Sequence, residues 1–120
     1  MPVHDLTAME LRGRIAAGQV SSVEATRAIL DRIDRLNPIV GAYLSVFPER
    51  ALDAAQEVDR KIAAGQPVGA LAGVPIAIKD VLCTTFGTTT CGSRILQDFH
   101  SPYDATVVRK LLAADAVIVG

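Results

Sequence analysis

The hydrophobic pattern of this chain changes its period near residue 70, and this change restricts the fold more than any other feature. Before it, apolar residues recur every three or four positions, as in helices that bury one face. After it, GVPIAIKD at residues 73–80 alternates large aliphatic residues with proline, alanine and lysine, and AVIVG at residues 116–120 is apolar throughout. These patterns predict a strand with one buried face and a strand from the middle of a sheet. The sequence therefore indicates the α/β class.

Two capping boxes mark the starts of the first two helices. Thr7 and Glu10 have the spacing in which a hydroxyl and a carboxylate each bind the other residue's backbone N–H group, and Ser21 and Glu24 repeat it. We expect the first helix to span about residues 8–17.

The ends of the next two helices are predicted from proline and glycine. The second helix is expected to stop at the Asn37-Pro38 pair, because proline lacks the N–H group that a helix interior requires. The third is expected to begin at Pro48, which a first helical turn tolerates, and to end at Gly65. Glu57 and Lys61 have the spacing of a favourable ion pair on its exposed side.

The remaining residues predict a βαβ unit. Residues 81–93, VLCTTFGTTTCGS, are too polar and too rich in threonine to form part of the core. Asp104 is a suitable N-cap for a helix that we expect to bury four aliphatic residues, Val107, Val108, Leu111 and Leu112. Because only one other strand is predicted to pair with the apolar strand, we expect these residues to begin a larger α/β protein in which further strands complete the sheet.

The charge is nearly balanced, with 12 Lys and Arg against 13 Asp and Glu and a formal net charge of −1. The basic residues are scattered, which argues against binding of nucleic acid by this chain alone. The opening MPVHDL lacks a signal-peptide pattern, and the longest apolar run, VGALAGVPIAI, is far shorter than the roughly 20 residues of a membrane-spanning helix. We therefore expect a cytoplasmic protein without membrane contact.

The cysteines and histidines predict no metal site. Cys83 and Cys91 lack CxxC spacing, and His4 and His100 lie outside any metal-ligand pattern. Neither cysteine has an adjacent histidine, so we expect reduced, partly buried thiols rather than a nucleophile. No GxxxxGK[ST] motif occurs, so no ATP or magnesium site is expected on this chain.

Lys79, which ends the alternating run, is the one candidate catalytic residue. Taken alone, a lysine at the end of a strand is more often a solvated terminus than a base, because lysines are rarely buried. Asp80 is expected to be a structural acid that caps a turn or pairs with a neighbour. The threonines Thr88, Thr89 and Thr90 either line the approach to a site or satisfy backbone groups, so their roles stay open.

Four segments in order, GVPIAIKD, TTTCGSRIL, SPYDATVVRKL and AVIVG, resemble the opening of the amidase signature family. The preceding TAMELRGRIAAGQVSSVEATRAILDRI, followed by NP, resembles the A subunits of glutamyl-tRNA(Gln) amidotransferases within that family. The resemblance implies an α/β/α sandwich around a mixed sheet, incomplete in this chain. Residues 1–120 are then the amino-terminal part of a single amidase domain, with a helical lead-in at 1–66 and the start of the α/β core at 70–120.

The resemblance also implies a Ser, cis-Ser, Lys catalytic triad in which Lys79 is the lysine. Full burial lowers the pKa of a lysine by up to about 3–5 units, and a neutral lysine can then accept a proton from a bridging serine while a second serine attacks an amide carbon. In relatives both serines lie downstream in a glycine- and serine-rich stretch, so no role is transferred to the serines of this chain, Ser21, Ser22, Ser45, Ser93 and Ser101. The chain alone is therefore expected to be inactive.

The resemblance further implies glutamine as the substrate, hydrolysed to ammonia, and the amidotransferase B and C subunits as partners. Ammonia then passes to the B subunit, where ATP and Mg2+ activate Glu-tRNA(Gln) for conversion to Gln-tRNA(Gln), while the C subunit braces the pair. No cofactor is expected on this chain, and tRNA is reached through the complex. Two alternatives stay open: a general amidase of the same family, and a helical interaction module without chemistry.

Overall fold

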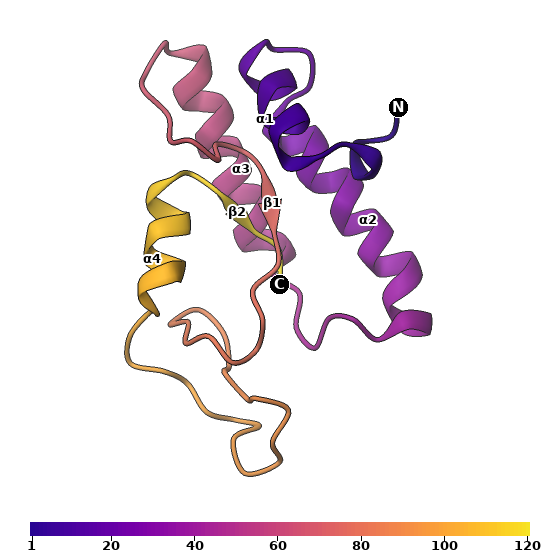
Figure 1. Cartoon of the computed structure of the whole chain (residues 1–120), viewed down its shortest axis with the longest axis vertical. Helices are drawn as coiled ribbons and strands as arrows, with labels where there is room; N and C mark the ends of the chain where they lie inside the picture. The colour runs from indigo at the N-terminus through magenta and orange to yellow at the C-terminus, as the bar shows by residue number, and fades with distance from the viewer.

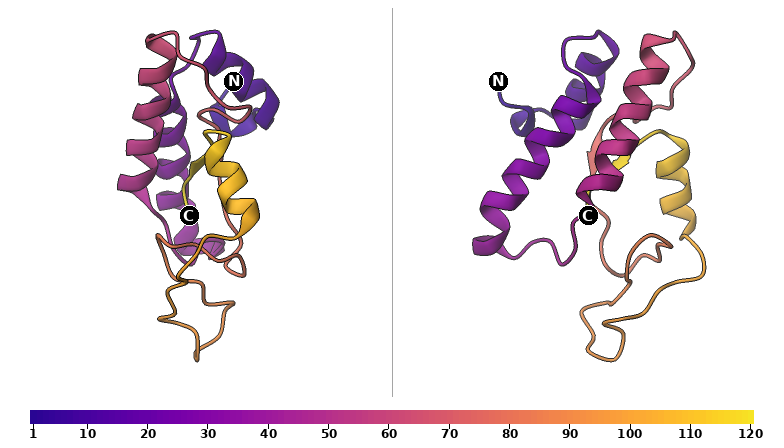
Figure 2. Two further views of the ribbon diagram at one scale, coloured as in Figure 1. Left: turned by 90° about the vertical axis from the view of Figure 1, so that its left-hand side faces the viewer. Right: turned by 180° about the vertical axis from the view of Figure 1, so that it is seen from behind.

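The computed structural model describes residues 1–120 and consists of a helical part followed by a small α/β part (Figure 1). The elements in chain order are the 3-10 helix η1 (Val3–Asp5), α1 (Ala8–Ala16), α2 (Ser22–Val40), α3 (Pro48–Ala63), β1 (Pro75–Ile76), α4 (Thr106–Ala113) and β2 (Val117–Ile118). Figure 2 shows α2 and α3 on one side of the strands and α4 on the other. The long connection between β1 and α4 extends away from the helices at one end of the molecule (Figure 1).

Both predicted capping boxes are present. The Thr7 hydroxyl accepts the N–H of Glu10 at 3.2 Å, while the Glu10 carboxylate accepts the N–H of Thr7 at 2.8 Å. Ser21 and Glu24 form the same pair of bonds at 3.0 and 2.7 Å. These bonds satisfy backbone donors that have no partner inside the helix. The predicted first helix and the proline and glycine limits of α3 are likewise confirmed.

A carboxylate from α3 also caps α2. Asp59 accepts hydrogen bonds from the N–H groups of Ser22 at 2.7 Å and Val23 at 3.0 Å. A negative charge is favourable at a helix amino terminus, where the helix dipole is positive. Asp59 therefore fixes the position of α3 relative to the start of α2.

The prediction that α2 stops at Asn37-Pro38 is wrong. The helix continues through Pro38 to Val40, and Gly41 ends it in the left-handed conformation, with φ of 64°. Proline leaves the carbonyl of Asp34 without its helical partner, but this last part of α2 is exposed, so water can bind the free carbonyl. A proline near an exposed helix end is therefore tolerated here.

The prediction that Glu57 pairs with Lys61 is also wrong. Glu57 binds Arg60 instead, with nitrogen–oxygen distances of 2.6 and 2.8 Å. Lys61 reaches across the fold to Asp115, with its Nζ 2.9 Å from the carboxylate. The long-range pair is less exposed than the local one, and it links α3 to the turn before β2.

β1 and β2 form a parallel pair, with Pro75 opposite Val117 and Ile76 opposite Ile118. The ladder of hydrogen bonds continues beyond these strands, from Val74 on one side to Gly120 on the other. Residues 116–119 are at most 4% exposed, as an apolar strand covered on both faces should be, and the predicted position of this strand in the middle of a larger sheet stays a prediction. The predicted βαβ unit is confirmed. The main core cluster joins this strand to α2 and α3, through Ile33, Ala51, Ala55, Val117 and Val119.

Two details of the predicted α4 are wrong. Asp104 does not cap the helix, which begins at Thr106 without a side-chain cap, because its carboxylate accepts the N–H of Thr85 at 2.7 Å. Val107 is 44% exposed, whereas Val108 is fully buried. A helix of 8 residues buries only a narrow stripe, and Val107 lies outside it.

Asp115 links the end of α4 to the turn before β1 through a hydrogen bond. Its carboxylate accepts the N–H of Gly69 at 2.7 Å as well as the Lys61 ammonium, and its backbone has a φ of 60°. Gly69 lies so close that an added Cβ would stand 2.3 Å from the carbonyl carbon of Ala114. Burial by itself raises the pKa of Asp115, but the Gly69 N–H and Lys61 together hold this pKa below its ordinary value.

Replacing Gly69 by alanine should destabilise the protein by about 1–3 kcal/mol, because backbone atoms of Ala114 must move to make room. Gly13→Ala is the matched control, since Gly13 lies inside α1 with no atom within 4 Å of an added Cβ. That change should stabilise by about 0.5–1 kcal/mol. Urea unfolding of the two variants checks this, and equal shifts in stability would contradict the close approach.

Replacing Asp115 by asparagine should cost about 1–3 kcal/mol at pH 7, since a half-buried charged acceptor is lost. The pKa of Asp115 is lowered by folding, so its carboxylate stabilises the fold above the ordinary value of 3.8. That contribution is lost as the pH falls through the lower, folded pKa. Unfolding measured from pH 7 down to pH 3 should therefore show the wild type and Asp115→Asn converging, and a constant difference would refute the assignment.

Candidate active site at the carboxyl end of β1

Lys79 lies directly after the last hydrogen bond of the parallel ladder. The N–H of Ile78 donates to the carbonyl of Gly120 at 2.9 Å, and the carbonyl of Lys79 accepts the N–H of Leu82 at 3.0 Å. The sheet and a turn therefore fix the backbone on both sides of Lys79. Its side chain is exposed, and its ammonium has no hydrogen-bond or ion-pair partner in the chain.

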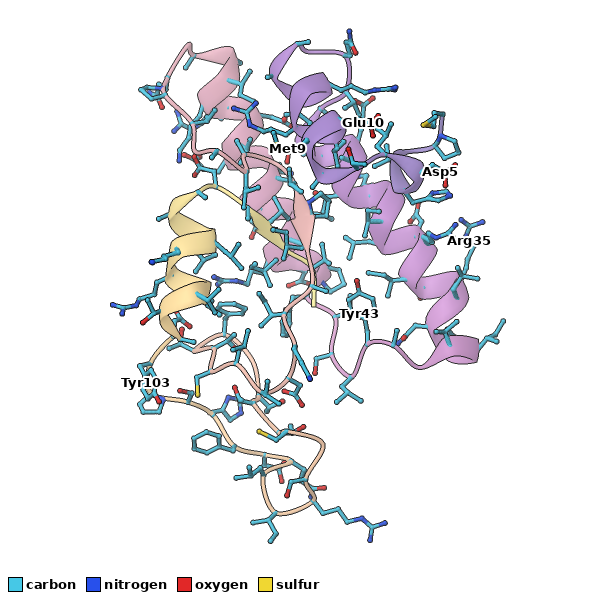
Figure 3. The ribbon with its side chains drawn as sticks, in the orientation of Figure 1. Asp5, Met9, Glu10, Arg35, Tyr43 and Tyr103 are labelled. Atoms are coloured by element: carbon cyan, nitrogen blue, oxygen red, sulfur yellow. The ribbon has the colours of Figure 1, made fainter.

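A hollow of about 670 Å³ opens beside Lys79. Its polar wall comes from the residues after β1 and from the threonine-rich loop: Lys79, Asp80, Thr84, Thr88, Cys91 and Gly92. The opposite wall is the segment between α2 and α3, which includes Tyr43, labelled in Figure 3 near the ends of the two strands. Small-molecule sites commonly have about 300–1,000 Å³ and lie beyond the carboxyl ends of parallel strands. The hollow has the size and place of such a site.

Asp80 joins β1 to the threonine-rich loop. Its carboxylate accepts the backbone N–H of Thr90 at 3.0 Å and also the Thr90 hydroxyl, while its carbonyl accepts the N–H of Cys91 at 2.8 Å. The expectation of a structural acid that pairs with a neighbour is confirmed. The Thr90 hydroxyl in turn accepts the N–H of Gly92 at 3.2 Å.

The expectation that the threonine-rich loop lies outside the core is wrong for two residues. Thr84 and Thr89 are only 5% and 4% exposed. The Thr89 hydroxyl accepts the N–H of Thr84 and donates to the carbonyl of Leu82, so its burial leaves no polar group without a partner. Thr88 lines the hollow, whereas Thr89 and Thr90 bind the chain itself.

Aromatic residues fasten this loop to the start of α3. Phe47 and Phe86 meet edge to face with ring centroids 5.7 Å apart, and the Arg50 guanidinium lies 3.9 Å from the centre of the Phe86 ring. Gly87 has no room for a side chain, because an added Cβ would stand 2.6 Å from the Phe47 ring. Sequence analysis missed this anchor, since its residues are separated by about 40 positions and share no periodic pattern.

Of the five serines, only Ser45 lines the hollow, and it makes no hydrogen bond to Lys79. Cys83 and Cys91 are free thiols. Cys91 is exposed rather than partly buried, so that part of the expectation is wrong. No group of three or more His, Cys, Asp or Glu side chains is placed to hold a metal ion. None of the helices combines the length and the hydrophobicity that a membrane crossing requires.

Comparison with known proteins decides the family. The sequence model of the amidase family matches residues 24–120, which is most of the chain. The chain belongs to the amidase signature family. Among its curated relatives, the A subunits of the glutamyl-tRNA(Gln) amidotransferases of Geobacter sp. (strain M21) and Salinispora tropica are 53% and 54% identical over 120 and 119 residues. These alignments cover 100% and 97% of the chain but only 24% of each relative, so the chain spans about a quarter of their length.

Solved structures of amidase signature enzymes share the fold. A bacterial aryl acylamidase of this family superposes with a TM-score of 0.92 at 29% identity, over 100% of this chain and 25% of its own. The peptide amidase of Stenotrophomonas maltophilia gives 0.88 at 37% identity, over 99% of this chain and 25% of its own. The helices and parallel strands described above are therefore part of an α/β amidase fold. The division into a lead-in at 1–66 and a core at 70–120 stays a prediction.

The exposure of the two thiols predicts their reactivity. In residues 1–120 alone, iodoacetamide should alkylate Cys91, on the wall of the hollow, faster than the half-buried Cys83. Peptide mass mapping after short labelling times measures both rates, with Cys91→Ser as the control that removes the faster one. Preferential labelling of Cys83 would show that the hollow is closed.

Proposed function

We propose that this chain is the amino-terminal part of the glutaminase subunit, the A subunit, of a glutamyl-tRNA(Gln) amidotransferase, in which it contributes the lysine of a glutamine-hydrolysing site. The observation that carries the proposal is the position of Lys79, on a backbone fixed by the sheet and at the wall of the hollow. The identity of 53% to a relative of that name, over the whole chain, supports the choice of glutamine as the substrate.

In this proposal Lys79 acts as the base of a Ser, cis-Ser, Lys triad. Both serines come from a segment beyond Gly120, and that segment covers the hollow and removes water from the lysine. Desolvation favours the neutral amine, which can then take a proton from the bridging serine. Backbone N–H groups meet the charge that develops on the carbonyl oxygen of the substrate.

The proposed partners follow from the same assignment. Ammonia from glutamine passes to the B subunit, which holds ATP and Mg2+ and converts Glu-tRNA(Gln) to Gln-tRNA(Gln), and the C subunit completes the complex in the cytoplasm. The near-zero charge of the chain suits a protein that leaves tRNA contact to a partner.

A general amidase of the same family is the second candidate. The hollow is lined largely by apolar residues, and fatty acid amide hydrolase resembles the chain with a TM-score of 0.85 at 30% identity. Comparing hydrolysis of glutamine with that of peptide, aryl and fatty amides by the complete protein separates the two candidates. Activity on glutamine alone supports the amidotransferase.

Lys79→Ala in the complete protein should abolish release of ammonia from glutamine, while the use of free ammonia by the complex is kept. Lys79→Arg should fail equally, because a guanidinium holds its proton at accessible pH. Lys110→Ala is the control, since Lys110 is an exposed lysine on α4 away from the hollow. Glutamine hydrolysis at the wild-type rate by Lys79→Ala would refute the catalytic assignment, and any turnover by residues 1–120 alone would refute the need for serines from beyond Gly120.

A further inference from the structure

We propose that Asp80 is a positioning residue for the reaction, which acts through Thr90 to hold the backbone of Lys79 against the loop wall of the hollow. This inference rests on the proposed function of Lys79. Asp80 lines the hollow, but its carboxylate is bound by Thr90, so its role in the proposal is to act on the lysine through the backbone.

The contacts of Asp80 all reach one short segment. Two donors of Thr90 bind the carboxylate, the N–H of Cys91 binds the carbonyl, and Thr90 passes the connection on to Gly92. Asp80 is covalently next to Lys79, so any movement of residues 90–92 is transmitted to the lysine backbone. Hydrogen bonds to a charged acceptor are stronger than bonds between neutral groups, so the Asp80 carboxylate can hold Thr90 firmly. The contacts of Asp80 with Thr90 and Cys91 are called the clamp below.

Residues 91 and 92, which the contacts of Asp80 hold in place, have left-handed backbone conformations. Cys91 and Gly92 are consecutive residues with φ of 52° and 67°. A left-handed conformation is unfavourable for cysteine and persists only where surrounding contacts require it. Asp80 supplies those contacts, through the N–H of Cys91 and through the Thr90 hydroxyl that binds Gly92. Both left-handed residues line the hollow, so the clamp shapes the wall as well as the lysine backbone.

The base of the loop is held independently of Asp80. Three cross-links join its two arms, namely Ala105 N–H to Cys83 C=O at 2.9 Å, Thr85 N–H to Asp104 Oδ1 at 2.7 Å and Thr89 N–H to Phe99 C=O at 3.0 Å. The aromatic contact between Phe47 and Phe86 fastens it further. Loss of the clamp should therefore leave the loop folded while it releases the wall beside Lys79.

Such a release matters because proton transfer is sensitive to distance. A base must come within about 2.6–3.2 Å of the proton donor, and a misplacement of about 1 Å can cost about 100-fold in rate. The Lys79 side chain makes no bond of its own in this chain, so the backbone alone determines where its ammonium can reach. The contacts of Asp80 add to the Ile78–Gly120 bond and to the turn from Lys79 to Leu82, and they alone tie this backbone to residues 90–92.

The test compares four variants of the complete protein. Thr90→Val removes the hydroxyl at nearly constant volume, Asp80→Ala removes the whole carboxylate, and Thr90→Ser restores the hydroxyl. Thr85→Val makes the same chemical change at an exposed threonine whose hydroxyl binds nothing and which lies outside the hollow. Measurements are kcat and KM for glutamine, the thermal midpoint, and the alkylation rate of Cys91.

Thr90→Val and Asp80→Ala should lower kcat by about 10- to 100-fold with KM changed far less, since proton transfer is disturbed more than binding. Thr90→Ser should recover most of kcat, and Thr85→Val should match the wild type. Cys91 should label faster in Thr90→Val but not in Thr85→Val.

A lower thermal midpoint with unchanged kcat in Thr90→Val would overturn the proposal, because it indicates a structural role alone. Equal kcat and equal Cys91 labelling in Thr90→Val and Thr85→Val would also overturn it. Failure of the proposed function looks different: Lys79→Ala then keeps wild-type glutamine hydrolysis, whatever the Thr90 variants do.

Discussion

The parallel pairing between residues 74–78 and 117–120 is the interaction on which the rest of this structure depends. The two segments are separated by about 40 residues, so their hydrogen bonds close a long loop, and the entropy of that closure must be offset by burial. The burial comes from both faces, because residues 116–119 lie between α2 and α3 on one side and α4 on the other. The Asp115 carboxylate, bound to Gly69 and Lys61, determines where the second strand begins.

The candidate site is a consequence of where that pairing ends. After Ile78 binds Gly120 the ladder stops, and the chain turns at Lys79 into a loop that is held by polar contacts and one aromatic pair. The shape of the candidate site thus comes mainly from hydrogen bonds and one aromatic contact rather than from a closely packed core. Polar contacts of this kind keep a wall in place while it stays open to solvent and to a substrate.

Local signals in the sequence predicted most of the fold. Capping boxes and strand patterns depend on residues a few positions apart, so Thr7 with Glu10 and the run before Lys79 could be assigned from spacing alone. The errors arose where a distant group decided the outcome. Lys61 was expected to bind Glu57 but binds Asp115, and Asp104 was expected to cap a helix but binds a loop N–H. Sequence spacing shows which partners lie nearby along the chain. It cannot show whether a side chain will instead bind a residue that becomes close only when the chain folds.

Lys79 is exposed, and so are apolar side chains that line the hollow beside it. Both would be removed from water if this face were covered. A hydrated ammonium is an acid, and the neutral amine becomes available as a base when desolvation or neighbouring positive charges lower the pKa. Leu44 and Val81, which also line the hollow, are 71% and 50% exposed, so covering this face would bury apolar surface and desolvate the lysine at once. The hydrophobic gain of burying these side chains would offset the cost of removing water from an amine. If Lys79 has the catalytic role proposed above, its place among exposed aliphatic residues would couple desolvation of the lysine to the covering of this face.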